Sequence, residues 1–489
     1  MDRNLVLAVV LSGAVYLGWF KYLEHRYPPS EVPAASAAAA SAGAPLAPTE
    51  IKAPEPEKAS RARGTEGSKT FEIGAVTVRI QPFGAGLVSY EYPGPLGRVE
   101  LVSDPDPGYF ASWADVEFRS VGTDPHWPVY EAKLPSGVVV RKEFLFGEQD
   151  ALKTLRFTFT NPGKSPVAVE PWKLAMGPGL GTVHSEEKEN HGLWRAVALT
   201  APPAGKKREA FVEPDLAPEP APFGGDWRWA GVSNRYFLVA AFPAQAHFSS
   251  VVHGAKSVQA PGKSWFGGDK VVEVLEPWVR AEAKPLTVAP GGSEVVEVPF
   301  YFGPKGYTHL STFGKGLERS VSFGWFHRVG KFTLDVLHFF HRWTGNWGWA
   351  ILLLTLCLQV FLLPLSWKQQ KSMSGMKKVQ PELARIQQKF AKEPERLQRE
   401  MMEVYKKHGV NPLGGCLPIL LQMPIFVALF NMLRGAWELH GQPWIFWVAD
   451  LSAQDPYYIL PVTMGAVMFF QNKLNPQPVT DPAQAQMMT

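Results

Sequence analysis

The chain has 489 residues, with 49 lysines and arginines against 45 aspartates and glutamates, and a mean hydropathy of −0.09. This length predicts about two to four domains. The chain has 44 glycines and 44 prolines without a G-X-Y period, which excludes collagen, and 12% aromatic residues, which excludes a disordered chain. Its two cysteines, Cys357 and Cys416, exclude a disulfide scaffold and a cysteine-based zinc cluster.

The first apolar segment lies at residues 5–20 and contains no charge. It is shorter than the roughly 17–25 residues of a membrane span, but its flanks can extend it. A cleaved signal peptide is the alternative, although the nearest small-residue cleavage context, at 34–40, lies well beyond the apolar core. We therefore expect an uncleaved anchor over 1–27. A Pro/Ala-rich linker that cannot bury a core follows over 28–70.

Residues 71–304 have the pattern of a β-rich domain. Apolar and polar side chains alternate in strand-like stretches at 76–80, 138–146, 155–160 and 295–302. Turn signals such as Asn161-Pro162-Gly163 separate these stretches. Many short strands joined by Gly/Pro turns predict an antiparallel β-sandwich, and a domain of this size can bury a core on its own.

Between residues 305 and 347 the apolar period changes from two residues to three and four. The apolar positions are Phe326, Val329, Phe332, Val336, Phe339, Phe340 and Trp343. Arg328, Lys331 and other charged residues fall between them, which predicts an amphipathic helix with a basic polar face, suited to a membrane surface. A helix packed on the sandwich is the alternative, but the tryptophans that follow favour the membrane interface.

Three further apolar segments predict transmembrane helices at 348–366, 411–434 and 457–472. Residues 367–410 carry eleven lysines and arginines and five glutamates, whereas residues 434–456 carry one arginine and three acidic residues. Positively charged loops remain in the cytoplasm. We therefore expect 367–410 inside, the loop at 435–456 and the β-domain outside, and the N-terminus in the cytoplasm.

Residues 367–410 are expected to form a helical hairpin, with Pro381 in the first turn of one helix and Pro394 at the start of the next. A charged surface of this kind is usually a solvated face. Because its excess charge is positive and lies beside a membrane, contact with anionic lipids or ribosomal RNA is the second reading. Residues 473–489 are expected to be a cytoplasmic loop.

No catalytic constellation stands out in the sequence. The 12 histidines form no metal-binding spacing. The glycines at 177–181 lack the Lys-Ser/Thr of a phosphate-binding loop and predict a turn. We therefore expect no enzyme, no metal and no cofactor, so any work is passive or uses a partner's energy.

The second half of the chain resembles the YidC-type membrane protein insertases of Gram-negative bacteria. The resemblance rests on Gly345-Asn346-Trp347-Gly348, Asn411-Pro412-Leu413-Gly414-Gly415-Cys416, Gln422-Met423-Pro424-Ile425-Phe426, the run from Asp450 to Pro461, and Met468-Phe469-Phe470. It covers about residues 320–489. The order of anchor, linker and large outer β-domain agrees by architecture.

The resemblance implies a membrane α-helical bundle, an all-β periplasmic sandwich of supersandwich type and a cytoplasmic helical hairpin. The protein would insert and help to fold nascent inner-membrane proteins, alone or with the Sec translocon. The hairpin would recruit substrates, the ribosome or the signal recognition particle pathway. Its candidate residues are Lys377, Lys378, Arg385, Lys389, Arg396 and Arg399.

The resemblance also implies a polar groove within the bilayer, lined by Thr355, Gln359, Gln422 and Asn431. Phe426 and Met464 correspond to the flank that contacts substrate. Gln359 stands where family members usually have an arginine, five residues before the Pro-Leu pair, so the fixed positive charge is absent. Alternatives remain open for the others: Thr355 can bond to its own helix, Gln422 and Asn431 can join helices, and Phe426 and Met464 can serve ordinary packing.

The chain ends at Thr489, where the family continues with two further spans and a basic tail, so a fragment or truncated gene model is expected, with a natural four-span variant as the alternative. A membrane-tethered protein whose outer sandwich binds carbohydrate or envelope polymer is the alternative function. Loss of residues 71–300 would leave an insertase working and would abolish such a binding protein. A transporter would have inverted repeats, which the sequence does not display.

Overall fold

The computed structural model describes residues 67–474, except residues 123, 125–126, 148–149, 203–208, 264–268, 391–392 and 411–416. The anchor expected at 1–27, most of the linker at 28–70 and nearly all of the loop at 473–489 lie outside the described residues. The chain divides into two compact units. Of the described residues, the larger unit holds those within 67–357 and 424–461, and the smaller holds those within 358–423 and 462–474.

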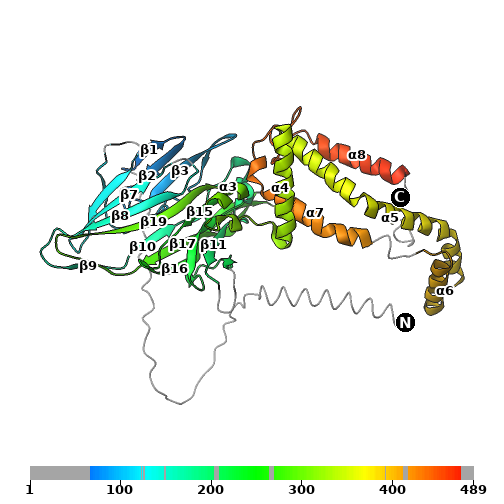
Figure 1. Ribbon diagram of the computed structural model, residues 1–489, viewed down its shortest axis with the longest axis horizontal. Helices are drawn as coiled ribbons and strands as arrows, with labels where there is room; N and C mark the ends of the chain where they lie inside the picture. The colour runs from blue at the N-terminus through cyan, green and yellow to red at the C-terminus, as the bar shows by residue number, and fades with distance from the viewer. Residues whose placement is uncertain are drawn as a thin grey trace, which may run out of the picture. The chain divides into compact units, whose positions relative to one another are not determined.

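The β-domain of the larger unit is built on a nine-stranded antiparallel sheet of order β12-β11-β14-β15-β19-β8-β7-β6-β5 (Figure 1). The bounds of its strands are β5 Arg119–Ser120, β6 Val129–Lys133, β7 Val139–Leu145, β8 Lys153–Thr160, β11 Arg195–Thr200, β12 Ala210–Val212, β14 Trp227–Ser233, β15 Phe237–Ala241 and β19 Ser293–Pro304.

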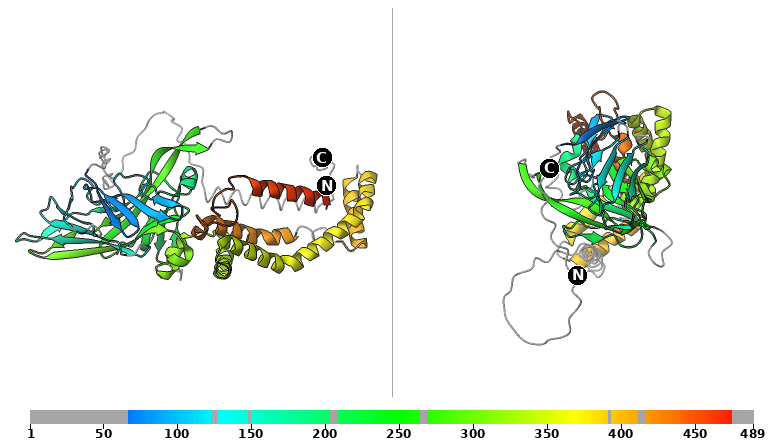
Figure 2. Two further views of the ribbon diagram at one scale, coloured as in Figure 1. Left: turned by 90° about the horizontal axis from the view of Figure 1, so that it is seen from above. Right: turned by 90° about the vertical axis from the view of Figure 1, so that its left-hand side faces the viewer.

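Three smaller antiparallel sheets complete the described part of the domain, with orders β1-β2-β3-β4, β10-β17-β16-β13 and β18-β9. Their strands are β1 Lys69–Ile73, β2 Val76–Ile80, β3 Leu87–Gly94, β4 Gly97–Glu100, β9 Val167–Val169, β10 Lys173–Met176, β13 Ala221–Pro222, β16 Phe248–Lys263, β17 Asp269–Ala283 and β18 Leu286–Val288. The long β16–β17 hairpin is visible in green in Figure 2.

The alternating stretches of the sequence are strands, so that part of the sandwich prediction is confirmed. In β8, Leu155, Phe157 and Phe159 are fully buried while the residues between them are partly exposed. Phe157 lies 4.6 Å from Trp172, ring centroid to centroid, and Trp172 stacks on Trp113 at 4.7 Å. This aromatic packing fills the centre of the domain, as expected where side chains of period two face one core.

A fully buried lysine, Lys142 of β7, fixes the loops beside this core. Its Nζ donates hydrogen bonds to the carbonyl oxygens of Gly84 and Ala85 at 2.9 Å and of Phe110 at 2.6 Å, and contacts Ser112 Oγ at 3.1 Å. Ala85 and Phe110 have φ angles of 43° and 59°, a left-handed conformation that is unfavourable for side chains other than glycine. Lys142 therefore satisfies carbonyl groups of a strained backbone. Burial lowers the pKa of its amine well below the usual range.

The loop at 436–461 packs on the β-domain within the larger unit. The Trp437 ring lies 5.1 Å from Phe237, 5.8 Å from Tyr236 and 6.3 Å from Tyr92. Asp450 Oδ1 holds the loop itself together, because it accepts hydrogen bonds from the amides of Gly441 and Ser452. The start of this loop is thus fixed to the folded β-domain.

The helices follow the β-domain in the chain. Their bounds are α3 Tyr307–Thr312, α4 His327–Thr344, α5 Trp347–Lys389, α6 Pro394–Lys407, α7 Leu417–Gly435 and α8 Ile459–Leu474. Shorter turns are η1 His184–Glu186, α2 Glu187–Asn190, η2 Leu317–Ser320, η3 Gly324–Phe326 and η5 Trp437–Leu439. The prediction that a helix begins at Pro381 is wrong, because α5 continues through Pro364 and Pro381. Each proline removes one backbone hydrogen bond, and the helix-forming residues on both sides maintain the helix.

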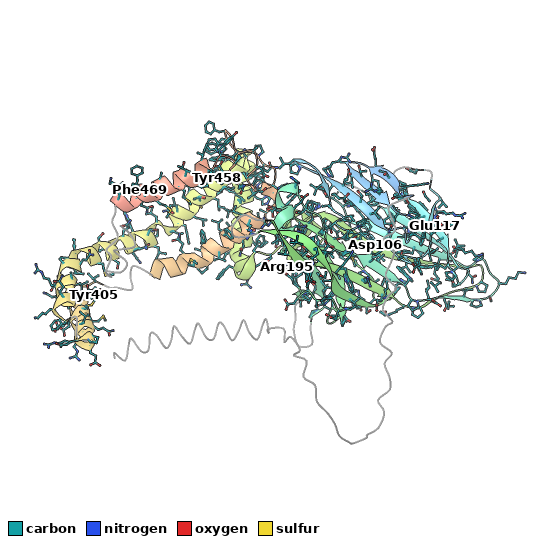
Figure 3. All side chains as sticks on the ribbon, turned by 180° about the vertical axis from the view of Figure 1, so that it is seen from behind. Asp106, Glu117, Arg195, Tyr405, Tyr458 and Phe469 are labelled. Carbon is teal, nitrogen blue, oxygen red and sulfur yellow. The ribbon has the colours of Figure 1, made fainter. Side chains whose placement is uncertain are left out.

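The start of a helix at Pro394 is confirmed, and α6 packs against the end of α5 in the smaller unit. Val379 and Leu383 of α5 form a buried cluster with Val404 of α6. At the rim, Glu382 pairs with His408 at 2.9 Å and with Lys407 at 3.5 Å, and the hydrogen bond from His408 lowers the pKa of Glu382. Figure 3 labels Tyr405 in this hairpin.

Replacing Lys142 with methionine should destabilise the β-domain by about 3 kcal/mol, because three buried carbonyl groups each lose the hydrogen bond from its ammonium. Urea unfolding of the full-length protein in detergent, followed by tryptophan fluorescence, measures the change. Lys133→Met, at the exposed end of β6, is the matched control and should change stability little. Equal stability of the two variants would show that the Lys142 bonds are dispensable.

Candidate functional site

Two polar side chains, Thr355 and Gln359, lie on one face of α5 because they are four residues apart. Both are exposed, and Thr355 Oγ1 donates to the carbonyl oxygen of Ile351 at 2.8 Å. The bond to its own helix agrees with the structural alternative for Thr355. The side-chain amide of Gln359 adds both donors and an acceptor to this face.

The surface around these polar groups is apolar. Leu356, Val360 and Phe361 of α5 are exposed, Phe361 to 73%. Exposing an apolar surface of this size to water is unfavourable, so it indicates contact with lipid or with another apolar surface. Within the described residues, Trp347–Met376 of α5 is the one helix long and apolar enough to cross a membrane, and Ile459–Gln471 of α8 is a shorter apolar helix.

The polar residues of α7 do not share a face. Gln422 is exposed and lies one turn before Phe426, which is 60% exposed and stacks on Phe430. Asn431 is nine residues after Gln422, so it points about 180° away from it around an α-helix. Asn431 lies against Gly324 of η3, where an added Cβ would be 2.6 Å from Asn431 Nδ2. Gln422 and Phe426 therefore form one surface of α7, and Asn431 belongs to another.

Met464 lies on α8, where every side chain that the structure describes is exposed. Met464 is 63% exposed, and Val462, Val467 and Phe469 are exposed to a similar extent (Figure 3 labels Phe469). The helix thus presents apolar side chains all round. Such a helix is stable only where hydrocarbon or protein covers it.

Helix α4 has two apolar surfaces, one buried and one exposed. Gly330, Thr333, Leu334 and Leu337 are buried within the larger unit. The prediction of one continuous apolar stripe needs correction, because Val329, Val336 and Phe340 are only partly buried, whereas Phe332, Phe339 and Trp343 are exposed. The helix is amphipathic as predicted, and it keeps a second, aromatic surface free after it has packed.

The charged residues expected in the hairpin lie on its surface. Lys378, Arg385, Lys389, Arg396 and Arg399 are exposed on α5 and α6, whereas the side chain of Lys377 lies outside the described residues. Arg396 pairs with Glu393 at 3.4 Å and lies over the Phe390 ring. Arg385 and Arg399 are available to a partner, because no ion pair of either occurs among the described residues.

Sequence reasoning missed a basic cavity in the larger unit. It has a volume of about 410 Å³, and its charged lining is Arg195, Glu213, Arg235, Lys305 and Arg434. These residues come from widely separated segments of the chain, so no local sequence motif predicts that they line one cavity. Among the described residues, no group of three or more histidine, cysteine or acidic side chains is arranged to hold a metal ion.

Labels at positions 332 and 339 should report contact with lipid. With Cys357 and Cys416 changed to serine, spin labels there should collide more with oxygen than with a water-soluble nickel complex, because both side chains are exposed and apolar. Labels at the exposed, charged positions 331 and 335 are the controls and should show the opposite preference. If the nickel complex reaches 332 as readily as 331, the aromatic surface of α4 faces water.

Comparison with family models gives two matches that together cover most of the chain. Residues 339–489 match the model described as the 60Kd inner membrane protein. Residues 98–334 match the model of the YidC periplasmic domain.

Individual relatives extend the match over the whole chain. A protein of Endomicrobium trichonymphae named membrane protein insertase YidC is 35% identical over 417 residues, 83% of this chain and 75% of that protein. The protein of that name from Nitratidesulfovibrio vulgaris is 32% identical and covers 100% of this chain and 92% of its own length. A crystal structure of an active YidC insertase aligns with 86% of this chain and 84% of that chain, at 17% identity and a TM-score of 0.35.

Proposed function

The chain belongs to the YidC family of membrane protein insertases, and from this premise we propose that it passes polar segments of nascent inner-membrane proteins through a polar groove within the bilayer. Members of this family are not enzymes, and the task is a transfer rather than a chemical reaction. The β-domain is the periplasmic domain of the family.

The groove has to lower a transfer barrier. A polar segment that crosses lipid leaves backbone groups without partners, at several kcal/mol for each group. A charged side chain at the centre of the bilayer adds roughly 2.5–3.5 kcal/mol on insertion scales. A partly hydrated groove provides hydrogen bonds for such a segment while the apolar part of the substrate moves along an apolar flank into the lipid.

Thr355, Gln359 and Gln422 are the proposed groove residues, and Phe426 and Met464 are the proposed flank. The observation that carries this proposal is the polar face formed by Thr355 and Gln359 within the apolar surface of α5. Phe426 supports the flank because it lies on the same surface of α7 as Gln422. Asn431, which was expected in the groove, is assigned instead to contact with η3.

Gln359 changes the character of the groove. Its amide donates and accepts hydrogen bonds but has no charge, so it cannot attract an acidic tail over a distance. Its desolvation also costs less free energy than that of an unpaired arginine. We therefore assign substrate binding at this position to hydrogen bonds with the backbone or with polar side chains of either charge.

The proposed topology is that of a multi-pass protein of the Gram-negative inner membrane with its N-terminus in the cytoplasm. Its spans are the segments at 1–27, 348–366, 411–434 and 457–472. The charge of residues 367–410 supports a cytoplasmic hairpin, and the poorly charged loop at 435–456 supports a periplasmic position.

The hairpin is the proposed docking site for the ribosome and the signal recognition particle pathway. Anionic lipids are a further proposed partner of its cationic surface. Its exposed cations support this role, because they form a positive surface on a pair of helices with its own small core. The Sec translocon is the proposed partner for larger substrates.

A photoreactive residue at position 359 should crosslink a stalled nascent membrane protein with a polar tail. Phe361, two residues along the helix and on another face, is the matched control and should give severalfold fewer adducts. Adducts are counted by gel electrophoresis of ribosome-bound chains in inverted membrane vesicles. Equal yields at 359 and 361 would contradict the groove, and adducts only on the β-domain would favour the carbohydrate-binding alternative.

Reversal of two charges in the hairpin should weaken ribosome binding. Arg385→Glu together with Arg399→Glu should lower the affinity of the full-length protein for ribosomes by about tenfold, and by less at high salt. Cosedimentation in detergent measures this affinity. Lys164→Glu, on an exposed loop of the β-domain, is the control and should bind as the parent does. Unchanged binding of the hairpin variant would refute the docking role.

A further inference from the structure

The basic cavity of the larger unit is lined by segments that the chain brings together from far apart. Arg195 comes from β11, Ser233 from the end of β14, Lys305 from the residue after β19, and Arg434 from the last turn of α7. Figure 3 labels Arg195. With four cationic side chains and one carboxylate, Glu213, in its charged lining, the cavity has an excess of positive charge.

Two of the four cations are already paired. Arg195 Nε lies 2.7 Å from Glu213 Oε1, and Nη1 of Arg195 donates to the carbonyl oxygens of Gly192 and Trp194. Arg235 forms an ion pair with Glu186. The fold holds these arginines in place and their carboxylate partners balance their charge, so the excess positive charge of the cavity comes from Lys305 and Arg434.

Lys305 and Arg434 have capacity for an anion. The Lys305 ammonium donates to Ser233 Oγ at 3.0 Å and to the carbonyl oxygen of Asn234, so among the described residues one of its three hydrogens lacks an acceptor. Arg434 is exposed and forms no ion pair within the described part of the chain. A guanidinium and an ammonium that face one cavity are the groups that proteins use to bind phosphate.

The remaining lining fits a ligand with both a polar and an apolar part. The lining includes the hydroxyl groups of Ser233, Ser320 and Ser322 as well as the apolar side chains of Val197 and Phe211. A free phosphate ion would use only the polar part. A phosphate ester joined to glycerol and acyl chains would use both.

We propose that this cavity binds the phosphate group of an anionic phospholipid of the outer leaflet, with Lys305 and Arg434 as its principal ligands. The choice of lipid as the source rests on the proposed topology, in which the end of α7 reaches the periplasmic surface of the bilayer. The shared chemistry is a phosphate ester, so soluble glycerol phosphate is the competing source. Bound lipid would connect the β-domain to the leaflet beside α7.

The protonation of Lys305 provides an independent readout. Burial lowers the pKa of Lys305 to about 8, with Glu213 raising it and Arg195 lowering it further. The other charged groups that face this region are Arg235, Glu186 and Arg434. An anion binds the protonated form better, so affinity should be greatest below pH 8 and should fall as the pH rises above it.

The test is native mass spectrometry of the full-length protein in a neutral detergent, titrated with dioleoyl phosphatidylglycerol or dioleoyl phosphatidylcholine. Lys305→Gln and Arg434→Gln should each weaken phosphatidylglycerol binding by about tenfold, because each removes a charge-assisted hydrogen bond. Lys164→Gln, outside the cavity, removes the same charge and should leave binding unchanged. The fall in affinity between pH 7 and 9.5 should be smaller in Lys305→Gln than in the parent.

Three results would overturn the proposal: equal binding of phosphatidylcholine, phosphatidylglycerol binding unchanged in both cavity variants, or glycerol 3-phosphate binding as tightly as the lipid. The last result would assign the cavity to a soluble phosphate ester. Because Arg434 is exposed, Arg434→Gln keeps the test valid if Lys305→Gln fails to fold. The binding assay does not depend on insertion, so crosslinking from position 359 can fail while lipid binding succeeds, and the reverse.

Discussion

Hydrocarbon contact is the constraint on which the helical part depends. Exposed apolar side chains cover much of α5, α7 and α8. Exposing them to water would cost about 25 cal/mol of stability per Å² of apolar surface. In lipid the balance is reversed, since Thr355, Gln359 and Gln422 become the unfavourable groups. The residues that would be unremarkable in a soluble helix are therefore the ones that need a functional explanation here.

The β-domain obeys a different rule, because its core is complete without lipid. Trp113, Phe157 and Trp172 pack together, and Lys142 satisfies strained loops beside them. Trp437 joins this self-sufficient domain to the loop at 436–461, which follows α7 in the chain and leads to α8. Packing on the β-domain thus restrains the segment that follows directly after α7.

Local patterns predict local structure in this chain, and they fail where distant segments meet. Alternation predicts β8 because every second side chain faces one core, and the three- and four-residue period predicts α4. The pattern cannot reveal that Trp437 packs on Tyr92, or that Arg195 and Arg434 line one cavity, because these contacts depend on tertiary folding. Pro381 misled the prediction because a proline suited to a first turn is also tolerated inside a long helix.

The candidate groove residues also show what sequence patterns can and cannot predict. The resemblance to the family suggests Gln359, and helical geometry alone separates Gln422 from Asn431, since nine residues correspond to about two and a half turns and place the two on opposite faces. Replacing the usual arginine with Gln359 removes an ion whose charge would need compensation in a low-dielectric site. A neutral amide remains hydrated or hydrogen-bonded without a counterion and does not discriminate by the sign of charge. The proposed groove therefore selects for hydrogen-bonding capacity, and the positive charge that it lacks lies instead at Lys305 and Arg434, outside the proposed spans or at their edge.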